Sequence, residues 1–274
     1  MYFITLTRKM GTHGSAIARR VADELQYNLY DTEAIENTAR ELGFLDDVRQ
    51  IDEKAPSVVQ RLFSHQPEVY LDRLHAVIYE LASRGNALFL GRGSHILLRD
   101  LTCALHIRVT ASLETRVRSL MERGFDREVA IRALQKSDHE REAFIKFAFG
   151  RAWDAPELYD LVLNMDKLSV DLAVSTILNA ARSEEIKACS VDALKSLEIM
   201  GLSSRAEAAL IEAGFTYGPI NSVSVTVVAP GKVQLGGMVE NAAGKAMAEK
   251  VVKGLKGVVS IDNQIRLTPA DRHA

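Results

Sequence analysis

The sequence predicts a chain of class α/β: a parallel sheet flanked by helices over residues 1–182, with a small α+β unit over residues 203–268. In the first unit, short apolar runs such as Ala87–Leu90 alternate with longer amphipathic segments, as buried parallel strands alternate with helices. The second unit has the order helix, strand, strand, helix, strand, with glycine-containing turns. The stretch over 183–202 is polar and charged at its start, and we interpret it as a linker or helix extension.

The composition indicates an ordinary globular protein. The chain has 274 residues, of which 47% are hydrophobic and 26% charged, and its net charge is −2. This balance predicts no bulk attraction to nucleic acid or to an anionic membrane. No apolar run approaches the roughly 18 residues of a membrane-spanning helix, and the N-terminus lacks the pattern of a signal peptide. With two cysteines in no metal-like spacing, these features predict a cytoplasmic protein.

The first element is a strand, a glycine-containing turn and a helix. The run Tyr2–Thr7 is β-prone, Arg8–Ser15 interrupts it with two glycines, and Ala16–Leu25 has apolar residues at four-residue spacing. This geometry directs free backbone N–H groups and the positive end of a helix dipole at a phosphate. A tight turn that needs glycine for a positive φ explains the same residues, and the loop alone leaves both interpretations open.

The turn differs from the standard phosphate-binding loop G-x-x-x-x-G-K-[ST], in which the lysine reaches the β- and γ-phosphates. Ser15 fits the last position, where its hydroxyl would bind Mg²⁺. Gly14 stands in place of the lysine, and His13 and Arg8 stand in place of the two glycines. A phosphate-binding loop of this kind needs another cation.

The chain resembles the cytidylate kinase-like family from Ile4 to Gly14 and again at Tyr30-Asp31, and the resemblance extends to about residue 182. The family reads I-T-[IL]-[ST]-R-x-x-G-[ST]-x-G, then a helix, then [FLY]-Y-D and another helix. The resemblance implies a P-loop kinase-like fold. It also implies a role for Arg8 as the cation that replaces the lysine, which true cytidylate kinases keep. The implied nucleotide-binding residues are Gly11, Thr12, His13, Gly14 and Ser15, with Ser15 also the Mg²⁺ ligand.

Residues for the second substrate follow the next elements. Segments 32–42 and 45–53 read as helical, 55–67 as a loop and 68–84 as an amphipathic helix. Gly91-Arg92 comes directly after the strand 87–90, at the edge where ligands of open α/β sheets gather. The resemblance implies that Asp31 and Arg92 face the acceptor, with Arg92 also catalytic. The alternative for Arg92 is a structural cap of a helix end.

Further along we expect a strand over 103–109, a helix over 112–123 with Ser112 as its N-cap, and two helices within 126–149. Asp138, Arg141 and Phe144 match the family pattern D-x-x-R-x-x-[FY]. The resemblance implies a lid in which Asp138 binds the acceptor and Arg141 is catalytic. A surface ion pair beside a core Phe explains the same spacing equally well. A strand over 159–166 and a helix over 168–181, capped by Ser169, complete the unit.

The second unit resembles a BON domain. The match rests on V-Q-L-G-G at Val233–Gly237 and on G-V-V-S-I-D-N at Gly257–Asn263. We expect a helix over 203–213, strands over 223–228 and 232–235, a helix over 241–255 and a strand over 258–267. The resemblance implies a lipid or protein partner.

These observations predict a nucleotide-binding protein. The first hypothesis is an ATP- and Mg²⁺-dependent nucleoside monophosphate kinase for CMP or dCMP. The second is a catalytically inactive nucleotide-sensing module that signals through the BON-like unit, and the third is an interaction protein on a kinase scaffold. Oligomerisation stays open. Because the two units have separate apolar patterns, we expect residues 1–182 to fold independently.

Overall fold

A computed structural model describes residues 3–43, 46, 67–101, 103–184, 192–215 and 221–268. Five strands form the main sheet, and all of their pairings are parallel. In spatial order the strands are β2 (Asn28–Tyr30), β3 (Ala87–Leu90), β1 (Phe3–Arg8), β4 (Ala104–Thr110) and β5 (Leu161–Asn164). The expected helix 45–53 and the expected loop 55–67 lie outside the described residues except at 46 and 67. The predicted parallel sheet is confirmed.

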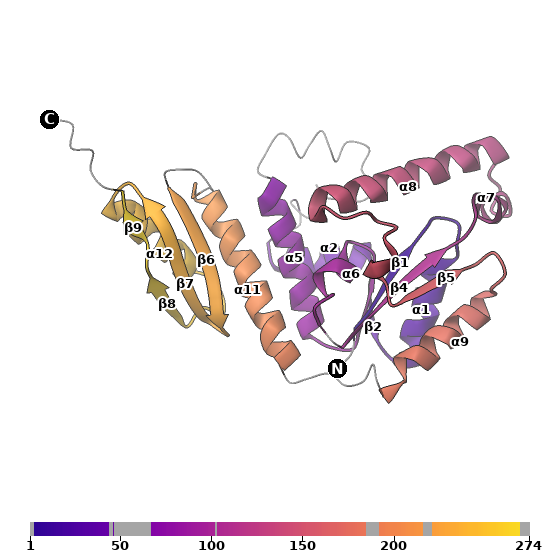
Figure 1. The fold of residues 1–274 in the computed structure, drawn as a ribbon, viewed down its shortest axis with the longest axis horizontal. Helices are drawn as coiled ribbons and strands as arrows, with labels where there is room; N and C mark the ends of the chain where they lie inside the picture. Colours follow the sequence, from indigo (N-terminus) through magenta and orange to yellow (C-terminus); the bar gives the residue numbers. More distant parts are fainter. Residues whose placement is uncertain are drawn as a thin grey trace.

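Helices cover both faces of this sheet (Figure 1). On one face lie α1 (Gly14–Leu25) and α9 (Val170–Ala181); on the other lie α2 (Thr32–Glu41), α5 (Pro67–Ser83) and α6 (Ser94–Leu97). The alternation of strand side chains divides the core between them, because Ile4 and Leu6 join the α1–α9 side whereas Phe3 joins the α5 side. The sheet is therefore buried on both faces, and its ligands can reach it only at the strand ends.

Side-chain caps fix where several helices begin. Asp31 accepts a hydrogen bond from the Ala34 backbone N–H at 3.2 Å at the start of α2. Ser112 accepts from Thr115 N–H at 3.3 Å and begins α7 (Leu113–Met121). Ser169 accepts from Leu172 N–H at 3.1 Å and begins α9. The predictions of Ser112 and Ser169 as N-caps are confirmed, and such caps typically stabilise a helix by about 1 kcal/mol.

The segment 126–149 forms one helix rather than the two that we expected. Helix α8 runs unbroken from Arg127 to Phe149, beside α7. It contains no proline or glycine, so nothing in its backbone interrupts the hydrogen-bond ladder. A short 3₁₀ turn (η1, Pro156–Leu158) then leads into β5. The lid residues therefore lie on a continuous rod whose far end packs into the core through Phe144.

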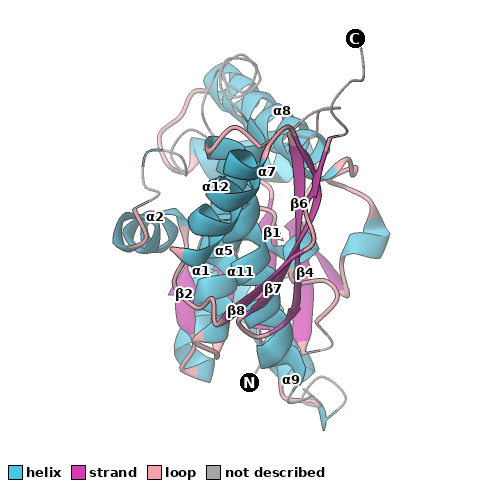
Figure 2. Ribbon diagram, turned by 90° about the vertical axis from the view of Figure 1, so that its left-hand side faces the viewer, coloured by secondary structure: helices cyan, strands magenta, loops and turns pink. Residues whose placement is uncertain are grey.

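The second unit is a four-stranded mixed sheet with two helices. Its elements are α11 (Asp192–Glu212), β6 (Ser222–Ala229), β7 (Lys232–Val239), α12 (Ala242–Lys253), β8 (Ser260–Asn263) and β9 (Arg266–Leu267). The strands β6 and β7 are antiparallel, whereas β8 and β9 both run parallel to β7. The expected strand 258–267 is thus two strands, and β7 continues four residues beyond the expected strand end at 235. Helices α11 and α12 lie against the sheet (Figure 2), and their side chains share one apolar core with it.

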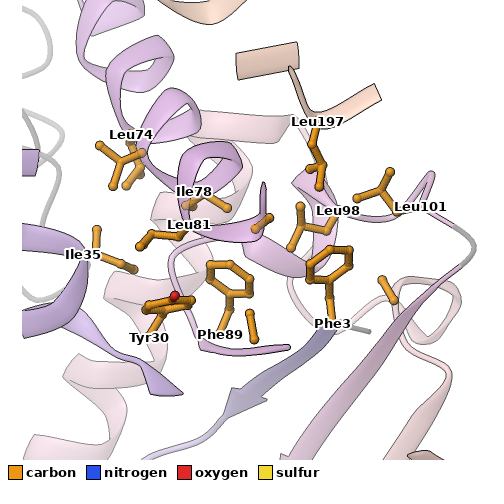
Figure 3. Close-up of a cluster of buried hydrophobic side chains, with 14 of the residues drawn as sticks. Phe3, Tyr30, Ile35, Leu74, Ile78, Leu81, Phe89, Leu98, Leu101 and Leu197 are labelled. Atoms are coloured by element: carbon orange, nitrogen blue, oxygen red, sulfur yellow. The ribbon is translucent and has the colours of Figure 1, made fainter. Parts of the chain in front are cut away.

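Helix α11 belongs to both cores. It runs through Gly201 instead of beginning at 203, and it lies between α5 and the second sheet (Figure 1). Near its N-terminus, Leu197 is buried in the α5 cluster of the first unit (Figure 3). Nearer its C-terminus, Leu202 and Leu210 are buried in the core of the second unit. Among the described residues, no helix is both long and apolar enough to cross a membrane.

Candidate functional site

The loop between β1 and α1 has the backbone of an anion-binding turn. Gly11 has a φ of +83° and His13 a φ of +58°, so the chain turns sharply before α1 begins at Gly14. The Thr12 hydroxyl donates to the Lys9 carbonyl at 2.7 Å and holds the turn closed from inside. Ser15 is exposed in the first turn of the helix, where backbone N–H groups have no intrahelical acceptors. This geometry suits a phosphate group.

Arg8 takes the room that a side chain at position 14 would need. A Cβ built on Gly14 would lie 2.5 Å from Arg8 Cβ and 2.9 Å from Arg8 Cγ. The stem of Arg8 therefore crosses the Gly14 backbone, at the position from which the lysine of a standard loop would extend. Glycine at 14 and arginine at 8 are sterically coupled, because a side chain at 14 would clash with the stem of Arg8.

A cavity of about 450 Å³ opens at this loop. Five cationic residues line it: Arg8 and Lys9 from the loop, Arg123 beyond the end of α7, and Lys136 and Arg141 from α8. The wall contains one carboxylate, Glu140, whose oxygen lies 3.9 Å from Lys136. All five predicted loop residues, Gly11 to Ser15, line the same cavity. The structure thus brings Arg8, Arg141 and the loop together around a strongly positive space.

Three charged residues that line the cavity, Lys9, Arg123 and Glu140, were not predicted from the sequence to bind a ligand. Arg123 is exposed and lies in a turn after α7, where a basic residue is an ordinary solvated side chain. Only the packing of the α7–α8 pair beside the loop brings it to the cavity. Lys136, two residues before Asp138 on α8, also lies in the wall.

Asp138 lies outside this wall and holds the lid helix. Its two oxygens accept from the Arg116 guanidinium at 2.9 and 2.8 Å, and Lys9 lies 4.0 Å away. Arg116 is buried, so the pair fastens α8 to α7 where its charges are shielded from solvent. Arg141, one turn further along α8, is also buried and donates to the Ser137 hydroxyl at 2.6 Å.

Asp31 and Arg92 lie away from the cavity wall. Asp31 is half-buried and occupied as the N-cap of α2. Arg92 is 1% exposed and sits in a left-handed conformation, φ +58°, in the turn between β3 and α6. Its neighbours Gly91 and Gly93 line a narrow crevice that also touches Arg8 and Arg141. Arg92 is therefore behind the cavity, and its predicted contact with an acceptor stays a prediction.

A buried polar cluster supports the end of β1. The His95 and Tyr159 rings stack 13° from parallel, with centroids 5.1 Å apart, and Thr7 Oγ1 lies 3.3 Å from His95 Nδ1. Burial, together with the charges of His106 and Arg108, lowers the pKa of His95 from 6.5 to about 3. His95 is consequently neutral at physiological pH, and its surroundings indicate a packing role.

A second cavity, of about 310 Å³, lies on the other side of the loop. It shares Gly11, Thr12 and His13 with the first, and its remaining wall comes from α7 and from the segment Met165–Val170 before and within α9. His13 Nε2 lies 3.2 Å from Ser119 Oγ, so this side chain stands between the two cavities and ties the loop to α7. A ligand in both cavities would pass along the loop backbone.

The loop fits a magnesium nucleotide better than a protein-held metal. Among the described residues there is no cluster of three or more His, Cys, Asp or Glu side chains suited to a metal ion. Mg²⁺ in phosphate sites is held mainly by phosphate oxygens, waters and one or two protein oxygens. The exposed hydroxyl of Ser15 in the wall fits that donor set.

Comparisons with known proteins agree with this architecture. The chain matches the cytidylate kinase-like family over residues 3–167 and the BON domain over residues 202–269. A search of curated proteins finds no match. Among solved structures, an uncharacterized protein from Eubacterium ventriosum ATCC 27560 has a TM-score of 0.54 at 20% identity, covering 66% of this chain and 97% of that one.

Two further solved structures match at lower TM-scores. Shikimate kinase from Bacteroides thetaiotaomicron has a TM-score of 0.40 at 12% identity, over 66% of this chain and 99% of its own. Deoxyadenosine kinase from M. mycoides with bound dATP has a TM-score of 0.39 at 15% identity, over 66% of this chain and 100% of its own. At these identities the similarity concerns the fold. The family match spans more than half of the chain, and the protein belongs to the cytidylate kinase-like family.

Proposed function

We propose that this protein binds ATP with Mg²⁺ at the β1–α1 loop and transfers the γ-phosphoryl group to a nucleoside monophosphate, CMP or dCMP. The observation that carries the proposal is the convergence of five cations and one carboxylate on an anion-binding turn. Phosphoryl transfer needs positioning and charge neutralisation more than covalent chemistry from the protein. A cavity with this charge supplies both to a triphosphate.

Each part of the triphosphate has a partner in this arrangement. The backbone of Gly11–Ser15 holds the donor phosphates, and the Ser15 hydroxyl is available to Mg²⁺, which would neutralise phosphate charge. Arg8 provides the fixed cation that Gly14 cannot, since its stem occupies that position. The base and sugar lie along the loop in the second cavity, against His13.

The lid cations act on the transferred group. Arg123, Lys136 and Arg141 come from α8 and the turn after α7 and not from the loop, so they would face the outer phosphates of a ligand seated on the loop. In the transfer, an acceptor phosphate oxygen forms a bond to the γ-phosphorus while the bond to the β–γ bridging oxygen breaks. ADP leaves with that electron pair. Arg141 is buried and positioned by Ser137, which suits a cation that must meet the transferring group in one orientation.

A second candidate is the nucleotide-sensing module without transfer. The positions of the two carboxylates that the family resemblance assigned to the acceptor favour this candidate. Asp31 caps α2, and Asp138 is bound to Arg116. If both carboxylates keep these roles when nucleotide is bound, neither is available to an acceptor. The contact between α5 and α11 connects the second unit directly to the first, so that a change at the nucleotide site can reach it.

Thermal denaturation with ATP and Mg²⁺ tests the proposal. A ligand at 100 times its Kd adds roughly 2.7 kcal/mol to the free energy of unfolding, which raises Tm by about 5–10 °C for a chain of this length. Adenosine, which lacks phosphates, serves as the control and should give a much smaller shift. The absence of a shift with every nucleoside di- and triphosphate at millimolar concentrations would contradict both candidates.

A further inference from the structure

A third cavity, separate from the loop, lies where the two units meet. Its volume is about 430 Å³, within the range of small-molecule sites. Three parts of the chain build it: the α2–α5 face of the first unit, the middle of α11, and two turns of the second sheet. Its apolar wall consists of Leu42, Leu197, Leu202, Pro230 and Val259. Tyr79 adds an aromatic side chain from α5.

Arg205 is the charged centre of this cavity. The residue is half-buried, and its Nη2 donates a long hydrogen bond to the Lys256 carbonyl at 3.4 Å. Within the described part of the chain, its buried Nε has no hydrogen-bond partner, and the charge of Glu80 acts on Arg205 without an ion pair between the two side chains. A partly desolvated guanidinium without a paired carboxylate is costly, because its desolvation is only partly compensated.

The neighbouring backbone leaves this guanidinium accessible from the cavity. Cβ atoms built on Gly201 and Gly257 would lie 3.6 Å from Nη1 and 3.8 Å from Nη2 of Arg205, respectively. Glycine at both positions keeps those approaches open. Larger side chains there would cover the planar guanidinium and the N–H groups that bind carboxylates and phosphates.

The other charges of the wall do not satisfy Arg205. Glu80 lies 3.7 Å from Arg84, so part of its charge is already balanced on α5. Glu198 is exposed to solvent, and Lys256 is a positive charge at the rim of the cavity, opposite in sign to Glu198. Burial, with the charges of Asp100, Glu207 and Asp72, raises the pKa of Tyr79 to about 12, so the phenol brings no negative charge.

We propose that this cavity binds a small organic anion, a carboxylate or phosphate attached to an apolar or aromatic body, with the anionic group on Arg205. The leucines and Tyr79 hold the body. Because the same ligand touches α5, α11 and the turns of the second sheet, its binding also fixes the two units against each other.

Fluorine NMR with para-fluorobenzoate tests the site, because this probe joins a carboxylate to an aromatic ring. We expect saturable binding to the full-length protein, and at least tenfold weaker binding to Arg205→Gln. The neutral para-fluorobenzyl alcohol should bind at least tenfold more weakly than the benzoate. Arg123→Gln removes a matched cation from the loop cavity and should leave benzoate binding unchanged.

A second variant guards against misfolding of Arg205→Gln. Gly201→Ala adds one methyl group 3.6 Å from Arg205 Nη1, in ordinary contact with Tyr79 Cβ at 3.4 Å, and improves helix propensity, so it should keep the fold and weaken benzoate binding. Unchanged benzoate binding by Arg205→Gln or by Gly201→Ala would overturn the proposal, and so would loss of binding in Arg123→Gln, because the probe would then occupy the loop cavity. So would the absence of saturable benzoate binding at millimolar concentrations, or equal binding of the alcohol. None of these outcomes depends on nucleotide binding at the loop.

Discussion

Replacing Arg8 by methionine should weaken triphosphate binding without changing the shape of the loop. Methionine keeps an unbranched stem against Gly14, where the Arg8 stem fills the space that a Cβ would occupy. What is lost is the guanidinium. Four cations remain in the wall, Lys9, Arg123, Lys136 and Arg141, so the loss is that of one contact rather than of the whole site.

The magnitude follows from a single charge-assisted contact, about 1.5–3 kcal/mol, which corresponds to a rise in Kd of roughly 10- to 160-fold. Isothermal titration with ATP and Mg²⁺ measures it, and adenosine measures what does not depend on phosphate. A matched control is Arg20→Met on α1, where the arginine is exposed and pairs with Asp171 at 2.6 Å outside the cavity. Its ATP affinity should stay at the wild-type value.

The assignment of Arg8 to the phosphates is wrong if Arg8→Met binds ATP as well as the wild type does. It also fails if the variant loses ATP and adenosine affinity by the same factor, because Arg8 would then shape the loop and not contact phosphate. A loss confined to the triphosphate distinguishes the electrostatic role from the structural one.

Three other perturbations address the loop, the shared helix and the buried histidine. Gly14→Lys alone should abolish ATP binding through the clash with Arg8, and adding Arg8→Gly should restore measurable affinity in titrations; a single variant that binds normally would contradict the steric coupling. Leu197→Ala should lower the free energy of unfolding by about 2–5 kcal/mol in urea denaturation, whereas Leu172→Ala, at a side chain 51% exposed, should change it little; equal effects would show that α11 is not part of the first core. His95 has a folded pKa of about 3, below its ordinary 6.5, so the unfolded chain binds the extra proton and stability is lost as pH falls from about 6.5 towards 3; His95→Phe should reduce the slope of unfolding free energy in this window by up to about 1.4 kcal/mol per pH unit, and an unchanged slope would contradict the burial argument.

Much of the loop was predictable because its determinants are local. The apolar run before Arg8, the two glycines and the spacing of Ile17 and Val21 fix strand, turn and helix within about twenty residues. The same holds for the caps at Ser112 and Ser169, where one side chain bonds a backbone N–H three residues on.

The rest of the site depends on contacts between distant residues. Arg123 reaches the cavity because α7 and α8 pack beside the loop, and Asp138 is directed to Arg116 by that same packing. The sequence spacing left the lid role of Asp138 and a surface ion pair equally open, and it could not show that the partner is a buried arginine. Apolar periodicity indicates which face of a helix is buried, but it does not indicate which other helix packs against that face.

Helix α11 shows a further limit of the pattern. The expected helix of the second unit began at 203, beyond Gly201, and a glycine inside a helix costs about 1 kcal/mol relative to alanine. The structure continues through Gly201, since Leu197 and Leu202 on either side are buried in two different cores and both burials favour one helix. The boundary between the units therefore lies within a shared element, and whether residues 1–182 fold alone stays a prediction.

Phosphorus NMR of the protein with ATP, Mg²⁺ and each nucleoside monophosphate in turn tests the proposed activity most directly. We expect loss of the γ-phosphate signal of ATP and the appearance of two diphosphates, fastest with CMP or dCMP, and no transfer by Arg141→Gln. ATP that raises Tm but stays intact with every monophosphate would contradict phosphoryl transfer and leave nucleotide sensing as the function of the cavity.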